Sequence, residues 1–162
     1  MTVHNLHASD SLDRLGRAGA VAVPPTLASL AGLHAAWALG WRWPGGSKRE
    51  LAERVLGQSE RDRLGGARMP PAPLTWSVAV ALAAAAAIVR AAGTGPRSRT
   101  LRGAAWAVSA VFLARGAVSI PSDLIGGPDD TYQRLDLAIY SPLCLAVGAG
   151  TAAAVARTGR TP

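Results

Sequence analysis

AGAVAVPPTLASLAGLHAAWALGW, residues 18–41, is a run of 24 residues that contains no Asp, Glu, Lys or Arg. An α-helix rises about 1.5 Å per residue, so about 20 apolar residues cross a hydrocarbon layer of roughly 30 Å. Two further charge-free runs of that length cover residues 69–89 and 137–156, and a fourth, 103–122, holds one charge, Arg115. The four runs predict four membrane-spanning helices.

A soluble, alanine-rich helical bundle is the alternative, because the 162-residue chain carries a net charge of +7 and its mean hydropathy is only +0.20. A helix of a soluble bundle needs polar residues at helical spacing along its exposed face. Residues 78–89 and 138–156 show no such polar stripe. We therefore expect an all-α fold, an integral membrane four-helix bundle in one domain.

The expected organisation is a polar N-terminal tail, a four-span domain and a C-terminal tail, at residues 1–17, 18–157 and 158–162. Helix start and stop signals place the helices at about 24–43, 73–92, 101–120 and 135–157. Pro24 or Pro25 would begin the first helix and Pro121 would end the third. The first 17 residues have no apolar stretch of their own, so the first run is predicted to be an uncleaved membrane anchor.

The first loop is expected to hold a short helix. Ser47-Lys48-Arg49-Glu50 matches a capping box, in which a serine and a glutamate bond each other's backbone amides. Leu51, Val55 and Leu56 then give the helix one apolar edge. The helix lies either on the membrane surface, held there by its basic residues, or in solvent as an ordinary loop helix.

The number of basic residues in the loops does not by itself decide the orientation of the chain in the membrane. The termini and the second loop carry eight Lys and Arg residues, and the first and third loops also carry eight. Arginines between 90 and 102 lie close to two membrane ends, whereas the third loop is acidic, with Asp123, Asp129 and Asp130. The positive-inside rule then favours cytoplasmic termini. Trp106 would lie on the inner side, and an aromatic belt would lie on the outer side: Trp37, Trp41, Trp43, Trp76, Tyr132 and Tyr140.

Polar residues within the apolar runs form the candidate site. The first and third helices end on the side where the fourth begins, so His34, Arg115 and Asp136 share one half of the membrane. Tyr140 lies one turn after Asp136 on the same face, and Trp37 follows His34 at helical spacing. An unpaired buried arginine costs on the order of 3 kcal/mol or more. We expect Asp136 to pair with Arg115, with the other three residues nearby.

Two interpretations of this cluster are open. In the structural one, Arg115 and Asp136 tie the third helix to the fourth, and His34 donates a hydrogen bond between helices. In the functional one, the cluster lines a polar pocket that opens to the outer face. His34 would then exchange a proton near neutral pH, and Arg115 would hold an anionic group.

Several kinds of site are not expected. Cys144 is the single cysteine, so an intrachain disulfide, a CxxC redox pair and a cysteine-rich metal site are excluded. His4 and His7 lie in the polar tail and are expected to be solvated, and no metal or cofactor is predicted. The basic residues of the first loop alternate with acidic ones between two spans, so a nucleic-acid partner is not indicated.

Small residues and one proline within the spans suggest how the helices pack. Pro142 is expected to kink the fourth helix near its start. Five glycines look like positions of close helix–helix contact: Gly32, Gly40, Gly116, Gly148 and Gly150.

Three stretches resemble the motifs of one bacterial membrane family, known as domain of unknown function 3995. HAAWALG (34–40) is similar to its first-helix motif, and VFLARG (111–116) is similar to its third-helix motif. DLAIYSPLCL (136–145) resembles its fourth-helix signature, Asp-x-x-x-Tyr-Ser-Pro-Leu-Cys. The resemblance covers residues 25–155 and implies a short four-span protein of a bacterial cytoplasmic membrane without an assigned activity. Family members carry an acidic residue four positions after the third-helix arginine, where this chain has Ser119, and they have a shorter, more apolar first loop.

Three functions follow as hypotheses. The first is a non-enzymatic membrane protein that acts through a partner or as a homo-oligomer in the lipid bilayer. The second is a small carrier or channel-like dimer that moves a proton or an anion through the cluster. The third is a membrane enzyme acting on a lipid or a quinone-like molecule, for which one histidine and one aspartate form no recognisable catalytic set.

Overall fold

The computed structural model describes residues 3–94, 98–126 and 131–158, and within these ranges the chain forms helices and loops but no strand. The long helices are α1 (Val3–Ala38), α4 (Ala72–Thr94), α5 (Arg99–Gly126) and α7 (Ser141–Thr158). A short helix, α6 (Thr131–Leu135), and a π-helical turn, η1 (Asp136–Tyr140), lead directly into α7. The prediction of an all-α four-helix bundle is confirmed.

Four segments of the described chain are long and apolar enough to cross a membrane. They are Asp13–Ala38, Ala72–Thr94, Arg99–Ile120 and Thr131–Thr158. Each of these segments contains one of the four apolar runs found in the sequence, except for a few residues at the ends of a run.

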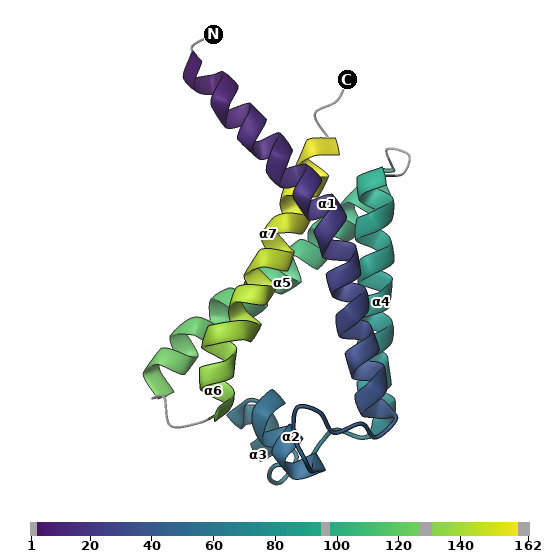
Figure 1. Cartoon of the computed structure of the whole chain (residues 1–162), viewed down its shortest axis with the longest axis vertical. Coiled ribbons are helices and arrows are strands. Elements are labelled where there is room, and N and C mark those ends of the chain that lie inside the picture. The colour runs from purple at the N-terminus through teal and green to yellow at the C-terminus, as the bar shows by residue number, and fades with distance from the viewer. Residues whose placement is uncertain (1–2, 95–97, 127–130, 159–162) are drawn as a thin grey trace.

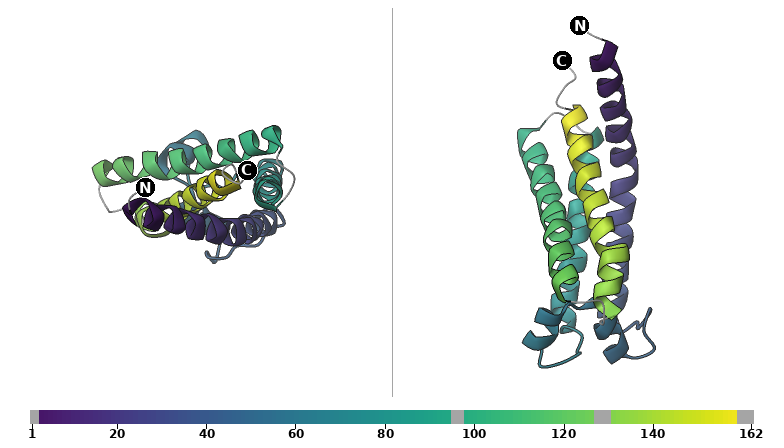
Figure 2. Two further views of the ribbon diagram at one scale, coloured as in Figure 1. Left: turned by 90° about the horizontal axis from the view of Figure 1, so that it is seen from above. Right: turned by 90° about the vertical axis from the view of Figure 1, so that its left-hand side faces the viewer.

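The long helices form two pairs that spread apart at one end of the molecule. α1 packs along α4, α5 packs along α7, and α1 also crosses α7. The pairs meet near the two chain ends and diverge toward the end that carries α2 (Lys48–Val55) and α3 (Gln58–Arg63) (Figure 1). Viewed from above, α7 lies between α1 and α5, and the side view places α2 and α3 beneath the bundle (Figure 2).

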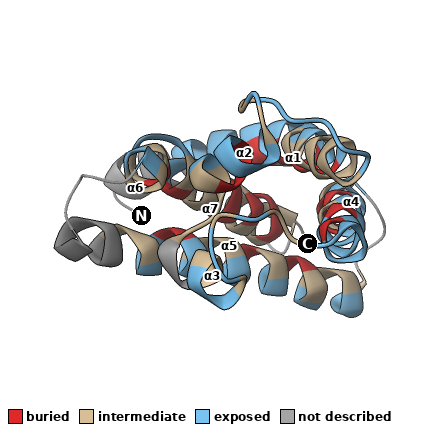
Figure 3. Cartoon of the chain, turned by 90° about the horizontal axis from the view of Figure 1, so that it is seen from below, coloured by how far each residue is buried: buried red, intermediate tan, exposed pale blue. Residues whose placement is uncertain are grey.

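Small residues close the end of the bundle opposite α2. A Cβ at Gly19 of α1 would lie 2.1 Å from the carbonyl oxygen of Gly150 in α7, so the two backbones touch. A Cβ at Gly148 would lie 2.7 Å from Cγ of Leu113, which brings α7 equally close to α5. The buried Ser109 hydroxyl donates a hydrogen bond of 2.8 Å to the Gly148 carbonyl oxygen. Seen from the α2 end, the buried residues of the long helices face their neighbours (Figure 3).

The predicted close contacts are only partly right. Gly116, Gly148 and Gly150 are each so close to a neighbouring helix that an added Cβ would collide with it. The prediction is wrong for Gly32 and Gly40, where an added Cβ meets no atom within 4 Å.

The first helix starts far earlier and ends earlier than expected. It runs from Val3, with Pro24 and Pro25 inside it, because the segment before the prolines packs against α7 through Gly16 and Gly19. Its end is set by Gly40, whose φ of +98° is readily available only to glycine. The Trp41 amide donates to the Ala36 carbonyl oxygen (2.9 Å), which closes the helix with a Schellman-type bond. His4 and His7 lie outside the residues whose side chains are described.

The remaining helices match the predicted positions with longer ends. α5 continues as a helix past Ile120, although Pro121 was expected to end it. The fourth span begins at Thr131 rather than near Leu135, because α6 and η1 extend it. Asp129 and Asp130 of the third loop lie outside the described residues.

The short helix of the first loop is confirmed as α2. Its Glu50 amide donates to the Ser47 hydroxyl (3.1 Å), while the Glu50 carboxylate accepts from the Gly46 amide (2.7 Å). Leu51 and Ala52 are 1% and 0% exposed, so α2 is packed against other parts of the chain on its apolar edge. A second short helix, α3, follows it and was not predicted.

Candidate functional site

Arg115 and Asp136 form the centre of the polar cluster, as expected. The Arg115 guanidinium, on α5, donates from Nη2 to Asp136 Oδ1 on η1 over 2.7 Å. The same nitrogen lies 2.7 Å from the Tyr132 hydroxyl on α6, which in turn donates to Asp136 Oδ1 over 3.2 Å. Asp136 is completely buried, whereas 41% of the Arg115 side chain is exposed. The arginine therefore neutralises a buried carboxylate through Nη2, donates from Nη1 to the Ser119 hydroxyl of its own helix, and remains partly exposed.

The π-helical turn decides which side chains reach Asp136. The Ser141 amide bonds the Asp136 carbonyl oxygen five residues back, which widens the turn ahead of Pro142. The buried Ser141 hydroxyl donates to Asp136 Oδ2 over 2.6 Å. In a regular α-helix, the residue one turn after Asp136 would be Tyr140. In the π turn, Ser141 takes this position beside Asp136.

Tyr140 instead joins the first loop to the bundle. Its hydroxyl donates to the Arg54 carbonyl oxygen of α2 over 3.2 Å. Its ring lies 6.1 Å from the Tyr132 ring between centroids. A Cβ on Gly57, just after α2, would lie 3.3 Å from the same Tyr132 ring. The two tyrosines thus hold α2 over the end of the helix bundle.

His34 forms its hydrogen bond within its own helix. Its Nδ1 donates to the Leu30 carbonyl oxygen of its own helix over 2.8 Å, so the expected hydrogen bond to another helix is not formed by this nitrogen. Its ring packs at 4.9 Å from the Trp37 ring, which confirms that these two residues share a face. The Trp37 indole donates to the Trp43 carbonyl oxygen over 2.7 Å and fixes the chain after α1.

A cavity of about 370 Å³ connects these groups, and we call it the inner pocket. It lies between the two helix pairs, and Val55 of α2 contributes to its lining. On α4 it reaches Leu82, ten residues or about 15 Å from the start of that helix. Its polar lining residues are His34, Arg115, Tyr132, Tyr140 and Cys144, and its other lining residues are Leu30, Leu33, Trp37, Val55, Val78, Leu82, Phe112 and Leu143.

The inner pocket brings together four of the five predicted site residues. His34, Trp37, Arg115 and Tyr140 line it, whereas Asp136 is buried behind Arg115. Sequence reasoning missed Tyr132 and Ser141 as partners of Asp136. Tyr132 stands four residues before Asp136, a spacing that could have identified it, but Ser141 stands five residues after, a spacing that matters only in a π turn.

The described residues contain no group of three or more His, Cys, Asp or Glu side chains that could hold a metal ion. The polar groups that line the inner pocket are guanidinium, phenol, imidazole and thiol groups. The guanidinium and phenol groups are suited to donating hydrogen bonds to a small molecule.

A family model described as protein of unknown function (DUF3995) matches residues 27–151. The chain belongs to this family. The resemblance of the three helix motifs is thereby confirmed, and the match of this DUF3995 protein includes Arg115, Asp136 and every lining residue of the inner pocket. No curated protein and no solved structure shows significant similarity to the chain.

Proposed function

We propose that this DUF3995 protein is a multi-pass protein of a bacterial cytoplasmic membrane with both termini in the cytoplasm. Its four apolar segments support the membrane assignment, and both chain ends lie at the end of the bundle opposite α2 and α3. Arg90, Arg99 and Arg102, where α4 ends and α5 begins, belong to the same end and favour the cytoplasmic side for it.

We further propose that the protein binds a small amphipathic molecule of the bilayer in the inner pocket. One observation carries this proposal: a guanidinium that is held in place by a buried carboxylate faces an otherwise largely apolar cavity. Small-molecule sites are commonly cavities of about 300–1,000 Å³ with apolar walls and a few placed polar groups. The inner pocket has this size and this composition.

The lining favours a planar, uncharged head group, such as that of a quinone-like molecule. Four of the eight Trp, Tyr and Phe residues in the chain line the pocket: Trp37, Phe112, Tyr132 and Tyr140. Aromatic side chains stack well on planar rings. Because Asp136 already balances the charge of Arg115, the guanidinium can donate hydrogen bonds to a carbonyl oxygen without requiring an anion.

Transport and catalysis have less support. A carrier would need a route through the closed end of the bundle, where α1 and α7 touch at Gly19 and Gly150. For an enzyme, the Asp136 carboxylate is engaged by Arg115, Tyr132 and Ser141, and His34 Nδ1 by the Leu30 carbonyl oxygen, so the two residues do not form a catalytic pair. Binding without a chemical step is the function that this arrangement favours.

The test compares two tryptophan variants of α4. Val78 lines the inner pocket, whereas Val80 on the same helix is 64% exposed and does not. Native mass spectrometry of the detergent-solubilised protein would measure retention of added decylubiquinone. We expect Val78→Trp to fill the pocket and reduce retention at least tenfold, and Val80→Trp to behave as the unmodified protein. Equal retention by the two variants would overturn the proposal.

A further inference from the structure

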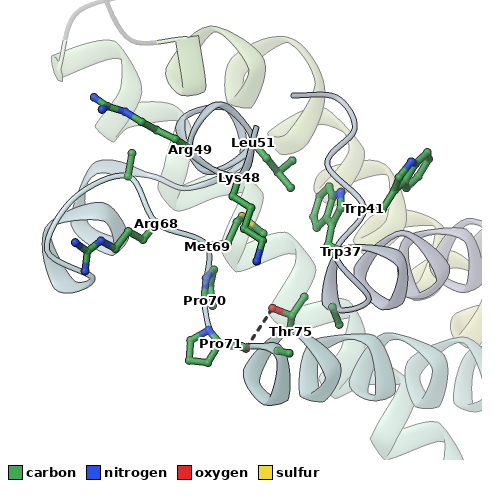
Figure 4. Close-up of a pocket in the computed structure, with 14 residues that line it drawn as sticks. Trp37, Trp41, Lys48, Arg49, Leu51, Arg68, Met69, Pro70, Pro71 and Thr75 are labelled. Atoms are coloured by element: carbon green, nitrogen blue, oxygen red, sulfur yellow. Dashed lines mark hydrogen bonds between the residues drawn. The ribbon is translucent and has the colours of Figure 1, made fainter. Parts of the chain in front are cut away.

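A second cavity, of about 440 Å³, lies outside the inner pocket where α1 ends and α4 begins, and we call it the surface pocket. The end of α1, the start of α2 and the segment before α4 contribute to it. Lys48 extends into this pocket, whereas Arg49 and Arg68 extend away from it (Figure 4).

The Lys48 ammonium group has no anionic partner. Within the described chain, Lys48 forms no ion pair or side-chain hydrogen bond, and no Asp or Glu lines the surface pocket. The nearest acidic groups in the sequence are otherwise engaged. Glu50 accepts from the Gly46 amide, and Glu53 pairs with Arg49 at 3.0 Å. A single negative charge in the pocket would therefore complement Lys48.

In the proposed membrane arrangement, the surface pocket lies at the level of the phospholipid head groups. The first apolar span ends at Ala38 and the second begins at Ala72, and both residues line the pocket. Trp41 lines it as well, and the Trp41 ring stacks on Trp43 with 5.8 Å between centroids. Both tryptophans are more than half exposed, as is typical of aromatic residues at a membrane interface.

We propose that the surface pocket binds the head group of an anionic phospholipid, with Lys48 as the contact to its phosphate. Met69 and Pro70 line both the surface pocket and a neighbouring cavity that reaches Leu74 of the second span, and this apolar side would receive the start of an acyl chain. A zwitterionic head group adds a positive charge near Lys48, Arg49 and Arg68, so a lipid with a net negative charge is preferred. This site goes beyond the proposed function, because it needs no ligand in the inner pocket.

Tryptophan fluorescence of the full-length protein in lipid vesicles tests this site directly. Brominated lipids quench tryptophans that they touch, and Trp37 and Trp41 line the surface pocket. In phosphatidylcholine vesicles, brominated phosphatidylglycerol is expected to quench at a lower mole fraction than brominated phosphatidylcholine. Lys48→Gln should reduce this preference about fivefold, which corresponds to about 1 kcal/mol for one basic residue at a membrane surface.

Arg42→Gln is the matched control, because Arg42 lies in the same loop, is exposed and does not line the surface pocket. It should keep the preference, and so should Lys48→Arg. Equal losses in Lys48→Gln and Arg42→Gln would show unspecific attraction to a charged surface and would overturn the proposal. Relief of the quenching by millimolar inorganic phosphate would also overturn it, since the site would then bind a free anion rather than a lipid.

Discussion

At the scale of single residues, Asp136 sets the character of the site. A carboxylate with no exposed surface is costly to bury unless charged and hydrogen-bonded partners surround it. Arg115, Tyr132 and Ser141 supply those partners from α5, α6 and α7. Arg115 has two roles as a result: it balances Asp136 and presents its exposed part to the inner pocket.

Replacing Arg115 by leucine is expected to leave the buried Asp136 carboxylate without its arginine partner. We expect a loss of about 3–5 kcal/mol in the free energy of unfolding, because one partner of a buried pair is removed. The double variant Arg115→Leu/Asp136→Leu should recover most of that loss. Thermal unfolding in detergent, followed by circular dichroism, measures both. A single variant as stable as the unmodified protein would show that the pair does not contribute to stability.

At the scale of elements, contacts between glycines decide how closely the helices pack. α1 and α7 touch at Gly19 and Gly150, and α5 and α7 touch at Gly148, so the bundle is narrow at this end. At the other end, the larger side chains Trp37, Phe112 and Leu143 separate the pairs and line the inner pocket. The π turn belongs to this open end and rotates Ser141 toward Asp136.

Alanine at Gly19 and at Gly32 should have opposite effects on stability. At Gly19 an added methyl group collides with the Gly150 carbonyl oxygen, and overpacking of this kind costs about 1–3 kcal/mol. At Gly32 nothing lies within 4 Å, so alanine should stabilise the helix by about 0.5–1 kcal/mol. The melting temperatures of the two variants in detergent measure the difference. Equal melting temperatures would contradict the close contact between α1 and α7.

At the scale of the whole molecule, one end of the bundle is closely packed and the other carries the pockets. The end with the termini is closed by Gly16, Gly19 and Gly150 and by the buried Ala92, Ala105 and Val155. The end with α2 and α3 carries both pockets, the exposed Trp41 and Trp43, and the loop residues Lys48, Arg49 and Arg68. Ligands that reach the inner pocket must therefore enter from the half of the bilayer next to α2.

Reporter fusions test the placement of these ends. A fusion after Arg61, in the first loop, is expected to report the outer side, and a fusion after Arg97 the cytoplasm. Alkaline phosphatase activity and green fluorescence, which require opposite sides of the membrane, provide the two readouts. Signals from the same side for both positions would contradict the four-span arrangement.

The sequence by itself determined where the chain is apolar, and hence the four helices, because about 20 consecutive apolar residues in a helix match the thickness of the hydrocarbon layer. It also determined α2, through the Ser47 cap, and the pairing of Arg115 with Asp136, since chain direction places both in the same half. Local signals failed at Pro24 and Pro25, because contacts with α7 hold the segment ahead of the prolines in the helix.

Only the tertiary structure decided how these parts meet. The approach of Ser141 to Asp136 depends on a π turn, and the separation of the helix pairs, with His34 and Arg115 lining the pocket between them, depends on inter-helix distances. Neither the π turn nor the distances between helices produce a repeating pattern in the sequence. The inner pocket follows from where glycines let helices touch and where aromatic side chains keep them apart, which is a property of neighbouring helices and not of any one of them.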